Sequence, residues 1–326
     1  MKFSVITPSF NQAQFLEETI LSVLGQGYEP LEYIVIDGAS TDGSVEIIRR
    51  YADRLSYWVS EKDRGQTEAI NKGLVRATGE VVTWLNSDDL FAPGALHAAA
   101  SYFKEHADVA LVHGKTLLFG EGFKEQVKGA EPRDLRVRSL AGIPFPQPSA
   151  FFRRKVLEEQ GYPEEAMHFG MDYDLFVRVA LNYELLAVDD LFSKYRLHNE
   201  SKSVAQSLGF ARDWARVFSK VLRSFEFTED LIEAMRGINL YSEGEDRYRV
   251  TKSFTHDELR RAFLYFIESH VSFDYNGLDT KTAGRLASFV KDFDPEFYRA
   301  GQLAKVRRRS KFLGGTVVKR LRSLRG

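Results

Sequence analysis

The chain up to residue 119 alternates short apolar runs with segments of helical periodicity. We predict strands at residues 3–7, 32–37, 57–60 and 80–85, and helices at 15–24, from Gly43 through Arg50, and at 67–77. Strands that alternate with helices in this way are typical of an α/β domain whose sheet is mainly parallel.

The pattern changes twice further along the chain. Short strands are predicted at 109–113, 115–119, 185–188 and 192–197, with a loop at 142–148 and helices ending at 156–161 and spanning 172–181. After residue 204 the sequence is helix-rich, with helices predicted at 210–225, 228–235, 256–270 and 283–290. We therefore expect one α/β domain over 1–204, a helical region over 205–304, and a separate segment at 305–326.

Composition excludes several classes of protein. Of the 326 residues, 44% are hydrophobic and 28% are charged, which is a globular balance. The absence of cysteine excludes disulfides, thiolate metal sites and a cysteine nucleophile, and it is compatible with the cytoplasm. No apolar run approaches the roughly 18 residues of a membrane-spanning helix, and the short apolar stretch near the N-terminus predicts a strand rather than a signal peptide.

The net charge of −1 conceals a basic C-terminal segment. Residues 305–326 contain nine basic and no acidic side chains, which leaves 36 basic and 46 acidic side chains in the first 304 residues. Apolar residues at 313, 317, 321 and 324 share one helical face, so the segment can lie in an anionic membrane interface or be a solvated terminus. Nucleic acid is not an expected partner, because aromatic residues are not interleaved with the basic ones.

Polar residues follow three of the predicted strands at their carboxyl ends. They are Thr7-Pro8, Asp37, and the pair Asp88 and Asp89. Because ligands of open α/β sheets bind at this edge, we expect these residues to share one site.

The acidic pair has two interpretations. Adjacent carboxylates repel each other, so Asp88 and Asp89 are suited to binding a divalent cation such as Mg²⁺ or Mn²⁺. Alternatively, one of them caps the helix that follows Pro93.

Two other polar segments are equally open to a binding or a structural role. The turn Asp37-Gly-Ala-Ser-Thr-Asp-Gly43 suits hydrogen bonding to a nucleobase or ordinary turn chemistry. Ser60-Glu-Lys-Asp-Arg-Gly-Gln66 is either part of the site or a solvated loop before a helix. Neither a Walker-type loop nor a G-x-G-x-x-G motif is present in the sequence.

Taken together, these segments resemble family 2 glycosyltransferases. The motifs are Thr7-Pro-Ser-Phe-Asn11, Asp37-Gly-Ala-Ser-Thr-Asp-Gly43, Glu61-Lys-Asp-Arg-Gly65 with Asn71-Lys-Gly73, Asn86-Ser-Asp-Asp89 and Met171-Asp-Tyr-Asp174, in the family's order over residues 1–205. The resemblance implies a GT-A fold, a nucleotide-diphosphate sugar donor (a UDP-sugar is expected), a divalent metal and inversion at the anomeric carbon. On this basis residues 1–119 form the nucleotide-binding half and residues 120–204 the acceptor side.

The resemblance also implies residue roles. Pro8 and Asn11 line the nucleotide pocket, Asp37 holds the base with Asp63, Asn71 and Lys72 beside it, Asp88 contacts ribose or sugar, and Asp89 ligates Mg²⁺ or Mn²⁺. Asp172 matches the family's catalytic base, since inverting transfer needs one carboxylate to take the acceptor proton. His198 matches a position near the metal, where it is either a ligand or a structural histidine. Asn86 departs from the aspartate that usually begins the metal motif.

These inferences predict an inverting transferase that acts on a saccharide or lipid-linked saccharide acceptor in cell-envelope polysaccharide synthesis. The basic segment suits a cytoplasmic protein bound peripherally to the inner face of the membrane. Two other hypotheses are a non-catalytic nucleotide-sugar-binding protein and a sugar-phosphate nucleotidyltransferase. The latter is disfavoured because residues 9–13 have neither the glycine nor the positive charge of a triphosphate loop.

Overall fold

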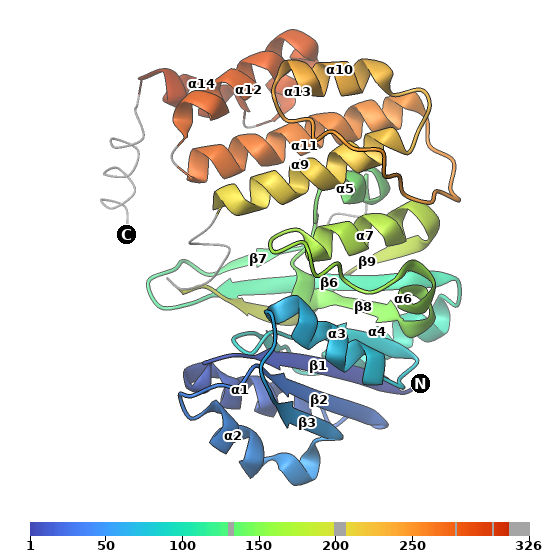
Figure 1. Ribbon diagram of the computed structural model, residues 1–326, viewed down its shortest axis with the longest axis vertical. Helices are drawn as coiled ribbons and strands as arrows, with labels where there is room; N and C mark the ends of the chain where they lie inside the picture. The colour runs from blue at the N-terminus through green and yellow to red at the C-terminus, as the bar shows by residue number, and fades with distance from the viewer. Residues whose placement is uncertain (130–133, 199–206, 278, 302, 313–326) are drawn as a thin grey trace. The chain divides into compact units, whose positions relative to one another are not determined.

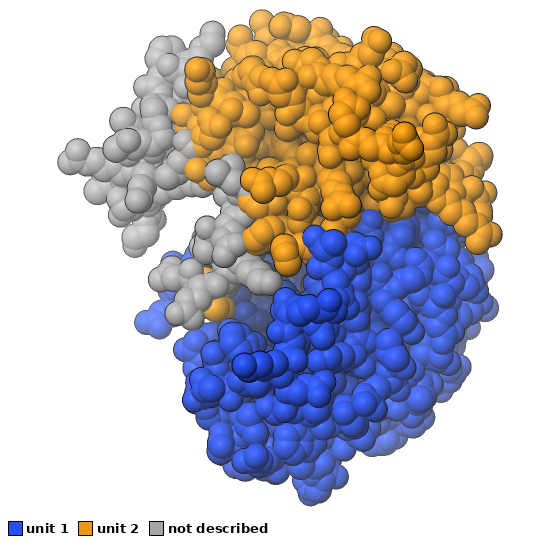
Figure 2. Space-filling model, viewed as in Figure 1, with its two compact units in different colours: residues 1–135, 143–166, 174–197 blue, residues 136–142, 167–173, 198–326 orange. Residues whose placement is uncertain are grey.

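The computed structural model describes residues 1–129, 134–198, 207–277, 279–301 and 303–312 (Figure 1). These residues form two compact units, coloured separately in Figure 2. The first comprises residues 1–135, 143–166 and 174–197, and the second comprises 136–142, 167–173 and the chain from 198 onward. The predicted boundary after residue 204 falls in 199–206, outside the described residues, and stays a prediction.

The first unit is built on a nine-stranded mixed sheet. Its strands are β1 (Phe3–Ser9), β2 (Leu31–Asp37), β3 (Tyr57–Ser60), β4 (Val81–Trp84), β5 (Leu90–Phe91), β6 (Val109–Phe119), β7 (Gln126–Lys128), β8 (Ala150–Arg153) and β9 (Glu184–Arg196). The order is β3-β2-β1-β4-β8-β6-β9-β5, with β7 paired to β6. Strands β3, β2, β1 and β4 are mutually parallel, and β8 runs antiparallel to β4 and β6.

Helices cover both faces of the parallel strands (Figure 1). They are α1 (Ala13–Leu24), α2 (Ser44–Arg50), α3 (Gln66–Arg76) and α4 (Ala95–Glu105). Alternate residues of β1 point to opposite faces of the sheet. Val5 belongs to the core with α1, α2 and α4, whereas Ile6 meets α3, where a Cβ on Gly73 would lie 2.4 Å from the Ile6 side chain. The alternating apolar pattern therefore produces the predicted α/β layers, and the predicted fold class is confirmed.

Two predicted strand pairs are single long strands. Residues 109–113 and 115–119 form β6 without a break, and residues 185–188 and 192–197 lie largely within β9. Gly114 makes the continuous pairing possible, because a Cβ there would lie 2.5 Å from the Asp190 carbonyl oxygen and 2.6 Å from the Phe192 ring. A glycine that looked like an interruption is thus required by the close approach of β9.

The first unit also contains α6 (Arg154–Gln160) and the 3₁₀ turns Ala52–Arg54 and Gln147–Ser149. Two further helices, α5 (Leu135–Ala141) and α7 (Met171–Asn182), contribute residues to both units.

The second unit is helical, as predicted for this part of the chain. It contains α9 (Ser207–Arg223), α10 (Glu229–Gly237), α11 (His256–Asn276), α12 (Thr280–Phe293), α13 (Pro295–Ala300) and α14 (Leu303–Phe312). Phe218 and Phe266 stack with ring centroids 4.3 Å apart in its core. Of the segment 305–326, residues up to 312 lie in α14 and the rest lie outside the described residues. Among the described helices, none combines the length and apolar character needed to span a membrane.

Candidate active site

The four parallel strands deliver their following loops to one edge of the sheet. Ser9 is the register partner of Asp37, and Asp37 is the register partner of Ser60. Strand β4 ends at Trp84 beside Ile6 of β1. The polar segments predicted to share a site therefore leave the sheet at neighbouring positions.

Asp37 organises the turn that follows β2. Its carboxylate is fully buried and accepts hydrogen bonds from the Ser40 amide (2.9 Å), the Ser40 hydroxyl (2.5 Å) and the Ser60 hydroxyl (2.7 Å). Three donors therefore bind the two carboxylate oxygens. This is the structural role in the turn that the sequence analysis gave as one of two alternatives for this segment.

The loop after β1 is joined to the same turn. The Asn11 amide donates to the Ser40 hydroxyl (2.8 Å), and the Asn11 side-chain oxygen accepts from the Thr41 amide (2.9 Å). Asn11 has a φ of +50°, a left-handed conformation that asparagine tolerates better than most residues. Pro8 is buried within β1 just before this loop. Asn11 thus fixes the β1 and β2 loops to each other.

Asp63 lies directly against the turn that Asp37 organises. Its Oδ1 accepts from the Gly65 amide (2.9 Å), and a Cβ on Gly38 would lie 2.7 Å from its Oδ2. Only glycine at position 38 leaves room for this carboxylate. The structure therefore brings Asp63 beside Asp37, as the resemblance implied for the base-binding residues.

Asn71 and Lys72 lie on α3 and make contacts with neighbouring chain segments. The Asn71 side-chain amide donates to the Pro163 carbonyl (3.0 Å). The Lys72 ammonium pairs with Glu61 (2.9 Å) and Glu68 (3.4 Å), and the hydrogen bond to Glu61 raises the Lys72 pKa. Both residues line a cavity of about 590 Å³ beside β3. Their described partners hold α3 to the segments around it.

The acidic pair differs sharply in exposure. Asp88 is half-buried, whereas Asp89 is 1% exposed and its Oδ1 accepts from the Arg196 amide (3.0 Å). Burial, together with the charge of Asp88, raises the Asp89 pKa well above its usual range. Neither aspartate caps the next helix, because α4 begins after Gly94 and that cap uses no side-chain hydrogen bond. The helix-cap interpretation is therefore wrong.

The pair fits a divalent cation that is shared with a substrate. Two adjacent carboxylates supply the oxygen ligands that Mg²⁺ and Mn²⁺ prefer, and a cation would offset the burial and the Asp88 charge that together raise the Asp89 pKa. Within the described residues, no group of three or more His, Cys, Asp or Glu side chains is arranged to hold a metal. A cation bound by this pair alone would take its remaining ligands from water and from the phosphates of a substrate.

Asn86 has a local reason to be an amide rather than a carboxylate. Its Oδ1 accepts from the Gln66 side chain (2.7 Å), and its Nδ2 lies 3.5 Å from Asp89 Oδ2. An aspartate could accept from Gln66 but could not donate to Asp89. Since Gln66 follows Gly65, Asn86 links the Asp63 loop to the acidic pair.

Asp172 and His198 belong to the second unit, so the site described above consists of first-unit residues alone. Asp172 is the second residue of α7 and is half-buried, and its carboxylate accepts from the Tyr173 amide (2.8 Å). The nearby Asp174 is buried and pairs with Arg178 (2.9 Å), which makes it a structural residue. His198 follows β9 by two residues and is half-buried.

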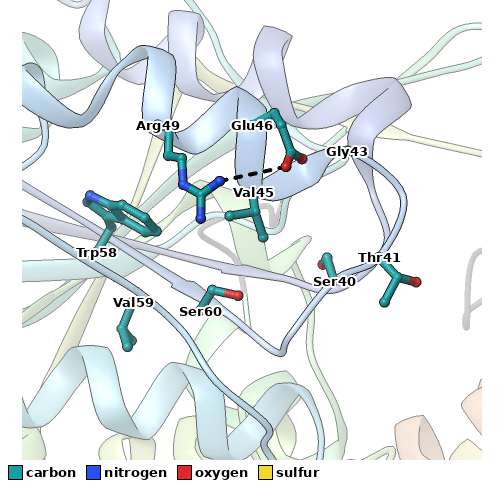
Figure 3. A pocket seen from close by; sticks show the side chains of 9 residues that line it. All are labelled: Ser40, Thr41, Gly43, Val45, Glu46, Arg49, Trp58, Val59 and Ser60. Carbon is teal, nitrogen blue, oxygen red and sulfur yellow. Dashed lines mark ion pairs between the residues drawn. The ribbon is translucent and has the colours of Figure 1, made fainter.

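A second cavity, of about 580 Å³, opens beside α2 and β3 (Figure 3). Figure 3 shows Arg49 and Glu46 of α2, which form an ion pair (3.7 Å), and Trp58 of β3 among the lining residues. Ser40 and Ser60 line this cavity and also bind the Asp37 carboxylate. The cavity therefore adjoins the turn that carries Asp37.

The structure shows contacts and exposure at the site that the sequence did not indicate. Phe10 lies between Ser9 and Asn11 with 60% of its surface exposed, and its place after a buried strand was the one signal that could have singled it out. Gln66 and Arg196 bond residues of the acidic loop from 20 and 108 positions away. Such contacts leave no local pattern in the sequence.

A mainly parallel α/β sheet with acidic side chains gathered at its carboxyl edge is typical of the class of α/β proteins that bind a ligand at that edge. Comparison with known proteins identifies the family within this class. The sequence profile of Glycosyl transferase family 2 matches residues 4–161. An uncharacterized glycosyltransferase of Mycobacterium tuberculosis is 31% identical over 188 residues, which cover 57% of this chain and 71% of that protein. The chain belongs to glycosyltransferase family 2.

Two solved structures share the fold. Residues 1–349 of Staphylococcus aureus TarS in complex with UDP-GlcNAc align with a TM-score of 0.56 at 17% identity, covering 95% of this chain and 92% of that structure. TarS is a poly(ribitol-phosphate) beta-N-acetylglucosaminyltransferase, and the sequence match covers 30% of its length. The mannosyltransferase PcManGT of Pyrobaculum calidifontis, in complex with GDP-Man and Mn²⁺, aligns with a TM-score of 0.56 at 20% identity, covering 95% of this chain and 87% of that structure. Both likenesses support the GT-A type of fold.

Proposed function

We propose that this family 2 glycosyltransferase moves a sugar from a nucleotide-diphosphate donor, a UDP-sugar, to a saccharide or lipid-linked saccharide acceptor with inversion at the anomeric carbon. The observation that carries the proposal is the linked set of Asp37, Asp63 and the acidic pair at one edge of the sheet. The TarS complex with UDP-GlcNAc supports the donor class, and the name of TarS supports a cell-envelope polymer as the acceptor class.

The first unit would bind the donor. The resemblance gives the base to Asp37, but the Asp37 carboxylate already accepts from Ser40 and Ser60. Asp63 beside it would therefore accept the hydrogen bond from the base N3–H. Pro8, Asn11, Asn71 and Lys72 would form the surroundings of the nucleotide. A half-buried carboxylate such as Asp63 can accept this hydrogen bond while it still accepts from the Gly65 backbone amide. A base with an N–H at this position, such as uracil, would be favoured over cytosine.

The acidic pair would hold Mg²⁺ or Mn²⁺ together with the donor diphosphate, as the Mn²⁺ in the PcManGT complex suggests. Such an ion neutralises the negative charge that develops on the leaving diphosphate. Asp88, the more accessible carboxylate, would contact ribose or sugar, and Asp89 would be the metal ligand, as the resemblance implies. His198 is proposed as a further ligand.

Asp172 would take the proton of the acceptor hydroxyl as that oxygen attacks the anomeric carbon. One base is sufficient, because a single in-line displacement forms no covalent intermediate. Asp174 is not available for this step, since it is buried and paired with Arg178.

A donor screen tests the proposal. Purified protein incubated with Mn²⁺ and a panel of nucleotide sugars should release the nucleoside diphosphate slowly from one donor, and faster with the acceptor. Binding without turnover would favour a non-catalytic protein, and release of pyrophosphate would favour a nucleotidyltransferase.

Asp172→Asn separates catalysis from donor binding. This variant should retain UDP affinity with Mn²⁺ while transfer falls by about 10²-fold or more, because only the proton acceptor is lost. Asp174→Asn is the matched control for a change in helix charge: it should lower the melting temperature and leave the catalytic rate of the folded protein near that of wild type. Wild-type turnover by Asp172→Asn would remove Asp172 from the mechanism.

A further inference from the structure

The end of β9 holds the acidic loop through a single residue. The Arg196 side-chain Nε donates to the Asp88 carbonyl oxygen (3.0 Å), and the Arg196 backbone amide donates to Asp89 Oδ1 (3.0 Å). One residue therefore fixes both members of the acidic pair, from more than a hundred positions along the chain.

Arg196 is itself held firmly. Its guanidinium carbon lies 4.7 Å from the ring centroid of Phe15 and 4.6 Å from that of Phe119, and a terminal nitrogen pairs with Glu18. Only 15% of its side chain is exposed. Because Arg196 contacts α1, β6 and the acidic loop at once, the planar guanidinium joins three elements, a role that a lysine ammonium could not fill.

The acidic loop has one further anchor on α1. The Thr19 hydroxyl donates to the Asp89 carbonyl oxygen (2.8 Å) in a buried position. Backbone and carboxylate of this loop are therefore bound on two sides, which limits how far Asp88 and Asp89 can move when they meet a cation.

We propose that Arg196 is a positioning residue, which presets Asp88 and Asp89 for a divalent cation rather than binding the donor phosphates itself. The described hydrogen bonds of the guanidinium, from Nε to the Asp88 carbonyl oxygen and from Nη2 to Glu18, both serve the protein itself. The inference rests on the proposed function, since it assumes that the acidic pair meets a cation with a nucleotide.

The test uses nucleotide binding rather than turnover. Titration calorimetry with UDP, and in parallel with GDP, is run with saturating Mn²⁺ and with EDTA, on wild type, Arg196→Lys and Glu18→Gln. We expect Mn²⁺ to strengthen nucleotide binding to wild type and this enhancement to fall about tenfold in Arg196→Lys, with EDTA values unchanged. Glu18→Gln is the matched control: it removes the ion pair but leaves the bond to Asp88, so its enhancement should stay within about twofold of wild type.

The outcomes separate the inference from the proposed function. Equal Mn²⁺ enhancement in wild type and Arg196→Lys overturns the positioning role alone. Wild type that shows no Mn²⁺ enhancement with either nucleotide contradicts the proposed donor site, and the positioning role falls with it. If Arg196→Lys does not fold, Arg196→Met gives the decision, because it keeps an unbranched side chain of similar reach but removes the Nε donor to Asp88. Reduced enhancement in this variant supports the positioning role, and unchanged enhancement overturns it.

Discussion

Substituting Gly38 by alanine probes the contact between Asp63 and the Asp37 turn. The new Cβ would lie 2.7 Å from Asp63 Oδ2 and 3.2 Å from its Cγ, whereas ordinary contacts begin at 3.4 Å. Gly38 is not among the described residues with positive φ, so its backbone accepts alanine. The carboxylate of Asp63 must therefore retreat by about 0.7 Å or rotate away.

We expect Gly38→Ala to lower both the stability of the protein and its affinity for UDP. Moving Asp63 strains or breaks its 2.9 Å bond to the Gly65 amide, and because the carboxylate is half-buried, water replaces part of that bond. We expect the free energy of unfolding to fall by about 1 kcal/mol. If Asp63 meets the base, a charge-assisted hydrogen bond of about 1.5–3 kcal/mol is also lost, which weakens UDP binding roughly 10- to 150-fold.

A double-mutant cycle tests the reasoning. UDP affinity with Mn²⁺ is measured by calorimetry, and stability by urea unfolding, for Gly38→Ala, Asp63→Ala and the double variant. Since the clash requires the Asp63 carboxylate, Gly38→Ala should cost almost nothing further in the Asp63→Ala background. Two losses that simply add would refute the argument, as would a Gly38→Ala protein that binds UDP like wild type.

Three further predictions concern stability and membrane contact. His113 is fully buried, neither ring nitrogen has a hydrogen-bond partner among the described residues, and burial lowers its pKa to about 3. Between about pH 6.5 and pH 3, His113 is protonated in the unfolded chain but stays neutral in the folded protein. The free energy of unfolding is therefore highest above about pH 6.5 and falls as the pH is lowered, by about 2 kcal/mol at pH 5. Urea midpoints at pH 7.5 and 5 should therefore diverge between wild type and His113→Phe, and a constant difference would contradict this. Asp37→Asn should lower the free energy of unfolding by about 1–3 kcal/mol, because an amide cannot accept all three donors, and unchanged thermal unfolding would argue against that role. Removing residues 313–326 should reduce co-sedimentation with vesicles that contain anionic lipid while leaving α14, whose Arg307 binds Ser288, in place. Equal sedimentation would exclude this segment as a membrane contact.

Local periodicity was sufficient to predict most of the elements. The apolar runs at 3–7 and 32–37 became β1 and β2, and the helical spacing at 15–24 became α1. Each of these patterns depends on which neighbouring residues share a buried face, and that property is written in a few consecutive residues. The long strands β6 and β9 were predicted as pieces because Gly114 serves a partner far away in sequence.

The motifs also predicted which acidic residues lie at the sheet edge. Asp37 and the pair Asp88 and Asp89 follow buried strands, and parallel strands end at a common edge. The resemblance then indicated the family, which the profile match and the mycobacterial relative confirm.

The sequence by itself therefore determined the succession of strands and helices along the chain, the acidic residues at the edge of the sheet, and the family. Only the tertiary structure decided the partners: Asp37 bound by Ser40 and Ser60, Asp63 resting on Gly38, and Asp89 held by Arg196. The physical reason is that burial and periodicity constrain each segment separately, whereas a hydrogen bond or a close approach depends on the direction of side chains from segments that meet only after folding.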